Sequence, residues 1–339
     1  MSGPSLAARS LEAGRIAYRG TIRPEALEEV SFLPAERGRS VTLILNLINR
    51  EHAIQVSDRC FTWFRKDGAI EHTEDEHNKA VVFKDRFVFS YTGLGELPGC
   101  GRTDDWLARV LHDFDISLPP GDHDQARVFA RVAERATEAF GHREMGRLHP
   151  ARRRHLFVAI CWGRFPPGFD RFEPYLMVIS NFHTVDGSEL ALPLDHFEVL
   201  PPQRLRDPDT TRLVWFGARL GASERRALNA IKRLNPDRPG FAIAAIRLMA
   251  EQVRSVARSK RTVGGSLVAA AVPRDAIGVG AREHFLLAGR PAPGHETFLY
   301  LPRDERSEVS YLPHFVGDAG VVTNFEARVP GWQGGGEEH

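Results

Sequence analysis

The chain has 339 residues, 42% of them hydrophobic, and its 45 Lys and Arg residues nearly balance 44 Asp and Glu residues, for a formal net charge of +1. This balance excludes the bulk electrostatic attraction that draws proteins to nucleic acid or to anionic membranes, so we expect neither partner. Three widely spaced cysteines fit a reducing compartment, and we expect a cytoplasmic protein. No stretch approaches the roughly 20 apolar residues of a membrane span.

The N-terminal third predicts a short leader followed by strands. Residues 1–40 are rich in Gly, Pro, Ser, Arg and Glu, and we interpret them as a leader or arm. Residues 41–48 are apolar on both alternating faces, which is typical of a strand covered on both sides. Further strands are predicted at 53–58, 80–83 and 86–92, with a polar loop before the third, so these four segments predict an antiparallel meander.

The rest of the chain alternates between blocks of helices and blocks of strands. The predicted elements are, in order, helices at 103–114 and 124–140, strands at 156–160, 175–179 and 213–216, helices at 223–234 and 243–256, a strand at 266–272 and a Gly-rich tail at 326–339. Such a block order does not fit the βαβ units of a parallel sheet. It predicts an α+β domain over 41–325, a four-layer αββα sandwich of two antiparallel sheets.

Three polar residues lie at the ends of the predicted strands. Thr42 opens the first strand, Asp58 closes the second and Lys79 opens the third. If these ends meet, the lysine stabilises an alkoxide on the hydroxyl and the carboxylate holds the lysine charged. An ordinary Asp–Lys ion pair between two strand ends explains the same spacing, and both readings stay open.

These residues resemble a known family, the proteasome β-type subunits, which are N-terminal-nucleophile hydrolases. Asp58 lies sixteen positions after Thr42, and Gly93 lies fourteen positions after Lys79, as in that family. The segments that carry the resemblance are Val41-Thr42-Leu43, Ser57-Asp58-Arg59, Asn78-Lys79, Tyr91-Thr92-Gly93 and, late in the chain, Gly264-Gly265 with the strand after it.

The resemblance implies the αββα fold and a set of catalytic roles. Thr42 would be the nucleophile, Lys79 would lower the pKa of its hydroxyl, Asp58 would hold Lys79, and the backbone N–H of Gly93 would form the oxyanion hole. The implied activity is hydrolysis of a peptide or small amide substrate without cofactor or metal, after removal of residues 1–41. The family also implies self-association into a homo-oligomer or ring.

Two features keep a second function open. In the family the α-amine of the threonine relays the proton, and self-processing members carry Gly where this chain has Val41. Lys260 and Val263 stand where the family has a supporting Asp and Ser. The alternative is a catalytically silent relative that serves as an oligomeric scaffold or binding protein; a third option is an enzyme that uses the same cleft for other chemistry.

Other motifs carry less weight. The acidic and His-containing segment 71–77 could offer metal ligands, but a solvated loop explains it better. The Gly-rich segment 93–99 is interpreted as a turn, and the basic run 152–155 as a solvated loop. Cys60 lies close to Asp58 and could be an alternative nucleophile, although a small buried residue is the better interpretation.

Overall fold

The computed structural model describes residues 42–64, 69–74, 77–84, 87–117, 125–163, 172–205, 207, 209–274, 298–301, 309–311, 314–317, 320–322 and 326–328. The chain divides into two compact units, 1–30 and 31–339, and every described residue belongs to the second. The predicted leader, 1–40, lies outside the described residues, as does 329–339 of the predicted tail.

The four predicted helices are confirmed. They are α1 (Thr103–Ser117), α2 (Gln125–Phe140), α3 (Ala222–Ile231) and α4 (Phe241–Ser259). Each has an apolar stripe at helical spacing; in α2 the buried face includes Val128, Phe129, Val132 and Ala136. None of these helices is both long enough and apolar enough to cross a membrane.

A five-stranded antiparallel sheet contains both strands of the first hairpin. Its order is β13 (Arg212–Gly217), β1 (Leu43–Ile48), β2 (His52–Asp58), β14 (Leu267–Pro273) and β15 (Phe298–Leu301). The β1–β2 register pairs Ile44 with Ser57, so the start of β1 and the end of β2 lie side by side, at the same end of the two strands.

A second sheet has eight strands. Along its main path run β11 (Glu198–Val199), β10 (Glu173–Ser180), β9 (Leu156–Gly163), β6 (Phe87–Thr92), β5 (Ala80–Phe83), β17 (His314–Gly317) and β18 (Gly320–Val322), and β12 (Gln203–Arg204) pairs with β10. The β5–β17 pair is parallel, so the expectation of purely antiparallel sheets is wrong for this one pair.

The predicted four-stranded meander is also wrong. β1 and β2 belong to the five-stranded sheet, whereas β5 and β6 belong to the eight-stranded sheet. The segment predicted as a polar loop contains a hairpin of its own, β3 (Phe61–Phe64) with β4 (Ile70–Glu74), and the chain passes from one sheet to the other across it. Apolar alternation predicts a strand but does not say which sheet it joins.

Two two-stranded sheets and two short helices complete the described elements. They are β7 (Glu96–Leu97) with β8 (Gly101–Arg102), β16 (Val309–Tyr311) with β19 (Glu326–Arg328), and the 3₁₀ helices η2 (Met145–Arg147) and η3 (Pro150–Arg152).

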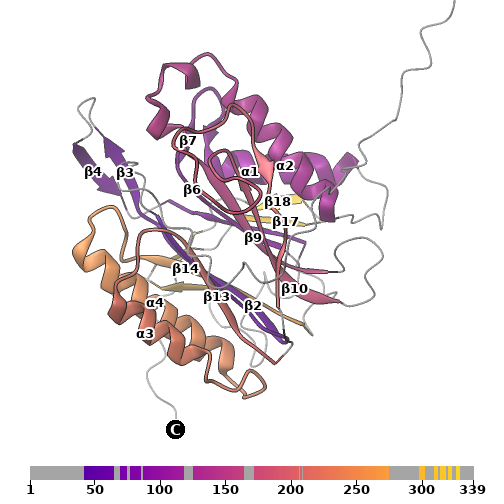
Figure 1. Ribbon diagram of the computed structural model, residues 1–339, viewed down its shortest axis with the longest axis vertical. Coiled ribbons are helices and arrows are strands. Elements are labelled where there is room, and N and C mark those ends of the chain that lie inside the picture. Colours follow the sequence, from indigo (N-terminus) through magenta and orange to yellow (C-terminus); the bar gives the residue numbers. More distant parts are fainter. Residues whose placement is uncertain are drawn as a thin grey trace, which may run out of the picture. The chain divides into compact units, whose positions relative to one another are not determined.

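Each sheet packs against its own pair of helices. Leu43, Leu45 and Leu47 of β1 face the cluster formed with α3 and α4, whereas Phe87 and Phe89 of β6 face the cluster formed with α1 and α2. Figure 1 shows α3 and α4, in orange, along the five-stranded sheet, and α1 and α2, in magenta, beside the eight-stranded sheet. Odd-numbered β1 residues therefore bury one face of the strand, and the even-numbered residues are buried on the other face.

The face of β1 that carries the even-numbered residues is buried by contacts between the two sheets. The indole N–H of Trp162 in β9 donates to the carbonyl of Val272 in β14 at 2.8 Å. The hydroxyl of Ser90 in β6 donates to the amide oxygen of Gln55 in β2, whose amide nitrogen donates to Asn46 at 2.8 Å. These buried polar groups are hydrogen-bonded to one another, and the bonds between the sheets fix the position of one sheet against the other.

Candidate functional site

The first three predicted site residues meet where the two sheets adjoin. Thr42 immediately precedes β1, Asp58 is the last residue of β2, and Lys79 immediately precedes β5 of the other sheet. The antiparallel β1–β2 hairpin brings Thr42 and Asp58 together, and the main-chain N–H of Leu43 donates to Asp58 Oδ1 at 2.8 Å. All three side chains are buried, with exposed fractions of 6% for Thr42, 0% for Asp58 and 3% for Lys79.

Lys79 links the other two residues. Its Nζ donates to Thr42 Oγ1 at 3.0 Å and to Asp58 Oδ2 at 3.1 Å, and it also donates to the carbonyl oxygen of Cys60. An ammonium group has three N–H donors and no acceptor, so these three contacts use all of them. Lys79 is therefore arranged as a charged donor and not as a base.

Asp58 accepts hydrogen bonds at both carboxylate oxygens. In addition to Lys79, the main-chain N–H of Cys60 donates to Oδ2 at 3.0 Å and that of Gly264 at 3.2 Å. Burial raises the pKa of the Asp58 carboxyl, and the Lys79 charge and these backbone donors oppose the rise. Because both oxygens face only donors, we infer that Asp58 is a carboxylate at neutral pH and forms a buried ion pair with Lys79.

The backbone of Thr42 is held by the neighbouring strand. The main-chain N–H of Ala218 donates to the Thr42 carbonyl at 2.9 Å. Gly217 has a φ of +90°, and a Cβ at this position would lie 1.7 Å from the Thr42 carbonyl oxygen. A glycine is therefore required for β13 to approach Thr42 so closely.

Gly93 is not a partner in the hydrogen bonds that join Thr42, Asp58 and Lys79. It follows β6 with a φ of +123°, and a Cβ here would lie 2.5 Å from His155 Nδ1 and 2.7 Å from the Arg154 carbonyl oxygen. Within the described part of the chain, the bonds among Thr42, Asp58 and Lys79 do not include Gly93. The structure thus brings three of the four predicted residues into contact and shows that the fourth position accepts only glycine.

Sequence reasoning missed the backbone groups that complete the site. The Cys60 carbonyl and the Gly264 N–H contribute no side chain, so no residue-type signal identifies them, although the Gly264-Gly265 turn is part of the family resemblance. Cys60 itself is buried, with Sγ 3.7 Å from Thr62 Oγ1. This agrees with its interpretation as a small buried residue.

The two residues that differ from the family pattern also take structural positions. Val263 is buried with an exposed fraction of 4% in the cluster under α3 and α4. Lys260 caps the end of α4, and its Nζ donates to the Arg219 carbonyl at 3.3 Å. Neither offers a carboxylate or a hydroxyl to Thr42.

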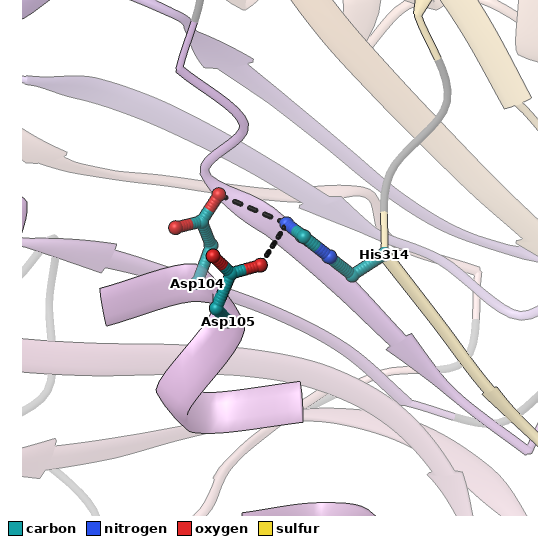
Figure 2. Close-up of side chains that lie close together, drawn as sticks. All are labelled: Asp104, Asp105 and His314. Atoms are coloured by element: carbon teal, nitrogen blue, oxygen red, sulfur yellow. Dashed lines mark hydrogen bonds and ion pairs between the residues drawn. The ribbon is translucent and has the colours of Figure 1, made fainter. Parts of the chain in front are cut away.

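A second polar cluster lies at the start of α1 (Figure 2). Asp104, Asp105 and His314 each offer a ligand atom, and these atoms lie within 4.8 Å of one another. However, His314 Nε2 lies 2.9 Å from Asp104 Oδ2, and the Arg102 guanidinium donates to both Asp104 oxygens, at 2.7 and 3.2 Å. A cation would have to displace Arg102, so we interpret the cluster as a clamp between α1 and β17.

The electrostatics of Asp104 support this interpretation. Burial by itself raises the pKa of Asp104, but the hydrogen bonds and charges of His314 and Arg102 outweigh it and hold the pKa at about 2. In the segment 71–77, considered above for metal binding, the expectation of a loop is wrong for residues 71–74, which belong to β4. After that strand, His77 Nε2 lies 3.3 Å from Glu74 Oε2.

Only the comparison with solved structures finds proteins similar to this chain. No protein-family model matches the chain, and no curated protein matches it. Among solved structures, the chain is similar to Anbu (ancestral beta-subunit) from Yersinia bercovieri, with 13% identity, a TM-score of 0.44, and coverage of 77% of this chain and 88% of that one. An Anbu (Gly-1) mutant from Hyphomicrobium sp. strain MC1 gives 15% identity, a TM-score of 0.39, and coverage of 69% and 82%. Scores this low carry no argument about residue roles, which rest on this chain's own geometry.

Proposed function

We propose that the chain is an amide or peptide hydrolase of the N-terminal-nucleophile type, with Thr42 as its nucleophile. The observation that carries this proposal is the Lys79 ammonium shared between Thr42 Oγ1 and Asp58 Oδ2 inside a buried site. A buried cation beside a hydroxyl stabilises the alkoxide that the hydroxyl must become in order to attack. The proposed fold is the four-layer αββα sandwich, supported by the two sheets with their separate helix pairs.

Repeated turnover needs a proton acceptor that the described residues of the uncut chain do not offer near Thr42. Lys79 is fully used as a donor, and both Asp58 oxygens are occupied. Cleavage of the Val41–Thr42 peptide bond converts the amide nitrogen of Thr42 into a primary amine, which is basic enough to accept the hydroxyl proton. The free amine is therefore part of the proposed mechanism.

The chemical steps follow from these groups. The Thr42 amine takes the hydroxyl proton while Oγ1 attacks the substrate carbonyl carbon, and the carbonyl oxygen becomes an oxyanion beside the Gly93 N–H. Collapse of this intermediate breaks the C–N bond, and the protonated amine returns its proton to the leaving amine. A water molecule then attacks the Thr42 ester, gives its proton to the same amine and releases the acid, which regenerates the hydroxyl.

Turnover of fluorogenic peptide amides by the purified chain tests the activity. We expect Thr42→Ala to abolish turnover and Thr42→Ser, which keeps a hydroxyl, to retain part of it. Thr62→Ala is the matched control, because Thr62 is a half-buried residue of β3 whose hydroxyl lies beside Cys60 Sγ, not beside Lys79. Turnover that survives Thr42→Ala would rule out this nucleophile.

A silent scaffold is the second candidate, and a specific observation favours it. Lys260 and Val263 supply no acid or hydroxyl to the site, so an uncut chain has only a buried Asp–Lys ion pair there. In a scaffold, substitution of Lys79 changes stability alone, whereas in the hydrolase it also removes turnover.

We also propose self-association into a homo-oligomer and a cytoplasmic location. The first is supported by the family resemblance, and the second by three cysteines that are all free. A monomeric mass by light scattering at micromolar concentration would contradict the first. Recovery of the chain in a periplasmic or secreted fraction would contradict the second.

A further inference from the structure

The segment Gly93–Gly95 is held by hydrogen bonds on two sides. The Leu94 N–H donates to Nδ1 of His155, the residue immediately before β9, at 3.0 Å. On the other side, the Thr103 hydroxyl donates to the Leu94 carbonyl at 2.7 Å, and the Thr103 N–H donates to the Gly95 carbonyl at 2.9 Å. Both polar groups of the Leu94 backbone are therefore satisfied by other elements.

His155 is a rigid anchor for this segment. It has an exposed fraction of 0% and packs between rings, with centroid distances of 4.6 Å to Phe157 and 5.8 Å to Tyr91. The main-chain N–H of His155 donates to Asn181 Oδ1 at 2.9 Å. Neither the ring nor the backbone of His155 can shift without disturbing the aromatic cluster around it.

His155 also leaves no room for a side chain at position 93, where a Cβ would lie 2.5 Å from its Nδ1. Thr92 pairs with Leu156 at the end of the β6–β9 ladder, which fixes the chain before Gly93. After Gly93, the Leu94 peptide is fixed on His155 Nδ1. The two dihedral angles of Gly93 are thus set from both ends, and with them the direction of its N–H.

A histidine at this position lowers the stability of the folded state in a way that an apolar residue would not. Because Nδ1 accepts from Leu94, the ring proton is on Nε2, and this buried atom has no hydrogen-bond partner within the described residues. An unsatisfied buried N–H reduces stability, so a Leu or Phe would pack here at lower cost. What the histidine supplies, and Leu or Phe does not, is an acceptor for the Leu94 N–H.

The acceptor is also permanent over the ordinary pH range. Burial holds the pKa of His155 at about 3, so the imidazole stays neutral and Nδ1 keeps its lone pair. A carboxylate could accept the same hydrogen bond, but it would bring an unpaired charge into an aromatic environment.

We propose that His155 is a positioning residue whose Nδ1 holds the Leu94 peptide and thereby aims the Gly93 N–H at the oxyanion. This inference rests on the proposed function, which assigns that N–H to the oxyanion hole. Aiming a donor at developing charge accelerates the chemical step without strengthening ground-state binding. Loss of the anchor should therefore lower kcat and leave KM nearly unchanged.

Three substitutions test this role with two separate measurements. His155→Leu keeps volume but removes the acceptor, and His155→Gln also lacks an acceptor at the δ position, in case the Leu variant does not fold. His155→Asn keeps an acceptor attached to Cγ. We expect Leu94 amide hydrogen exchange to accelerate by about tenfold or more in the Leu and Gln variants, with kcat for a peptide amide falling by about 10- to 100-fold, and both values to recover largely in the Asn variant.

The outcomes separate this inference from the proposed function. Unchanged Leu94 exchange in both the Leu and Gln variants would overturn the anchoring. Faster exchange with unchanged kcat, or a loss that appears in KM, would overturn the catalytic role. No rescue by Asn would show that the ring acts only as core packing. If the wild-type chain is inactive while Leu94 exchange responds as expected, the proposed function fails and the anchoring stands.

Discussion

At the scale of single residues, the buried Lys79–Asp58 pair determines both stability and chemistry. Removing one partner of a buried pair leaves the other charge uncompensated, which typically costs about 3–5 kcal/mol. We predict a loss of this size in the free energy of unfolding for Lys79→Met, measured by urea denaturation. The double variant Asp58→Asn/Lys79→Met should regain most of it, because no buried charge remains.

Lys232→Met, on the exposed surface of the chain after α3, is the control and should change the free energy by less than about 0.5 kcal/mol. A Lys79→Met variant as stable as the wild type would contradict the buried ion pair.

Gly217 offers a second residue-scale prediction because a matched glycine exists. Gly217 and Gly240 both have positive φ values, +90° and +77°, but a Cβ at 217 overlaps the Thr42 carbonyl, whereas a Cβ at 240 has nothing within 4 Å. Each Ala substitution should cost about 1–2 kcal/mol from backbone strain. Gly217→Ala should cost more than Gly240→Ala in urea denaturation and should also impair turnover. Equal losses of stability would contradict the close approach of β13 to Thr42.

Buried histidines predict how stability depends on pH. Burial holds the pKa of His155 at about 3, and burial together with the Arg154 charge holds that of His183 at about 4, both below the ordinary 6.5. The folded state therefore binds fewer protons than the unfolded state in this range, so stability is complete above pH 6.5 and falls as the pH drops toward 3. Burial raises the pKa of Asp58, which acts in the opposite sense.

Urea denaturation at several pH values measures this dependence. The decline between pH 6.5 and 3 should be shallower in His155→Leu, because that variant has one titrating group fewer. An identical pH profile for the variant and the wild type would contradict a buried, neutral His155.

At the scale of elements, the clamp between α1 and β17 holds a strand that is distant in sequence. His314 and Arg102 both bind Asp104, and the Lys84 N–H donates to the Val316 carbonyl at 2.9 Å. We predict that His314→Leu lowers the free energy of unfolding by about 1–3 kcal/mol, since it leaves a buried acceptor with one donor fewer. His314→Gln should lose less, because its side-chain amide can donate.

Hydrogen exchange locates the effect of that change. The Lys84 amide should exchange faster in His314→Leu if β17 loosens from β5. Arg131→Ala, which removes an exposed ion pair with Glu134 on α2, should leave this amide unchanged. An unaltered Lys84 rate in His314→Leu would show that the clamp does not hold the strand.

The helices and most strands could be predicted from sequence, because apolar periodicity reports which residues are buried locally. Sheet membership could not, since β1 and β6 are both buried on two faces yet belong to different sheets. The meeting of Thr42, Asp58 and Lys79 could be predicted because they lie at strand ends. The Gly264 N–H and the His155 anchor arise from contacts between distant segments, which local patterns do not encode.

At the scale of the whole molecule, the two sheets explain why the site forms where it does. Thr42 and Asp58 come from the five-stranded sheet and Lys79 from the eight-stranded sheet, so the ion pair exists only when the sheets adjoin. Any change that separates the sheets should disconnect Lys79 from Thr42. Fold and candidate chemistry are therefore coupled through a single lysine.

The intact mass of the purified chain, followed over time, tests the central claim most directly. The account predicts a product that begins at Thr42 in the wild type, and only the full-length mass in Thr42→Ala, because the Thr42 hydroxyl also attacks the carbonyl carbon of the preceding peptide bond, with water taking its proton in this single slow event. A single full-length wild-type species that stays unchanged after prolonged incubation would contradict self-processing. The site would then remain a buried ion pair without a nucleophile.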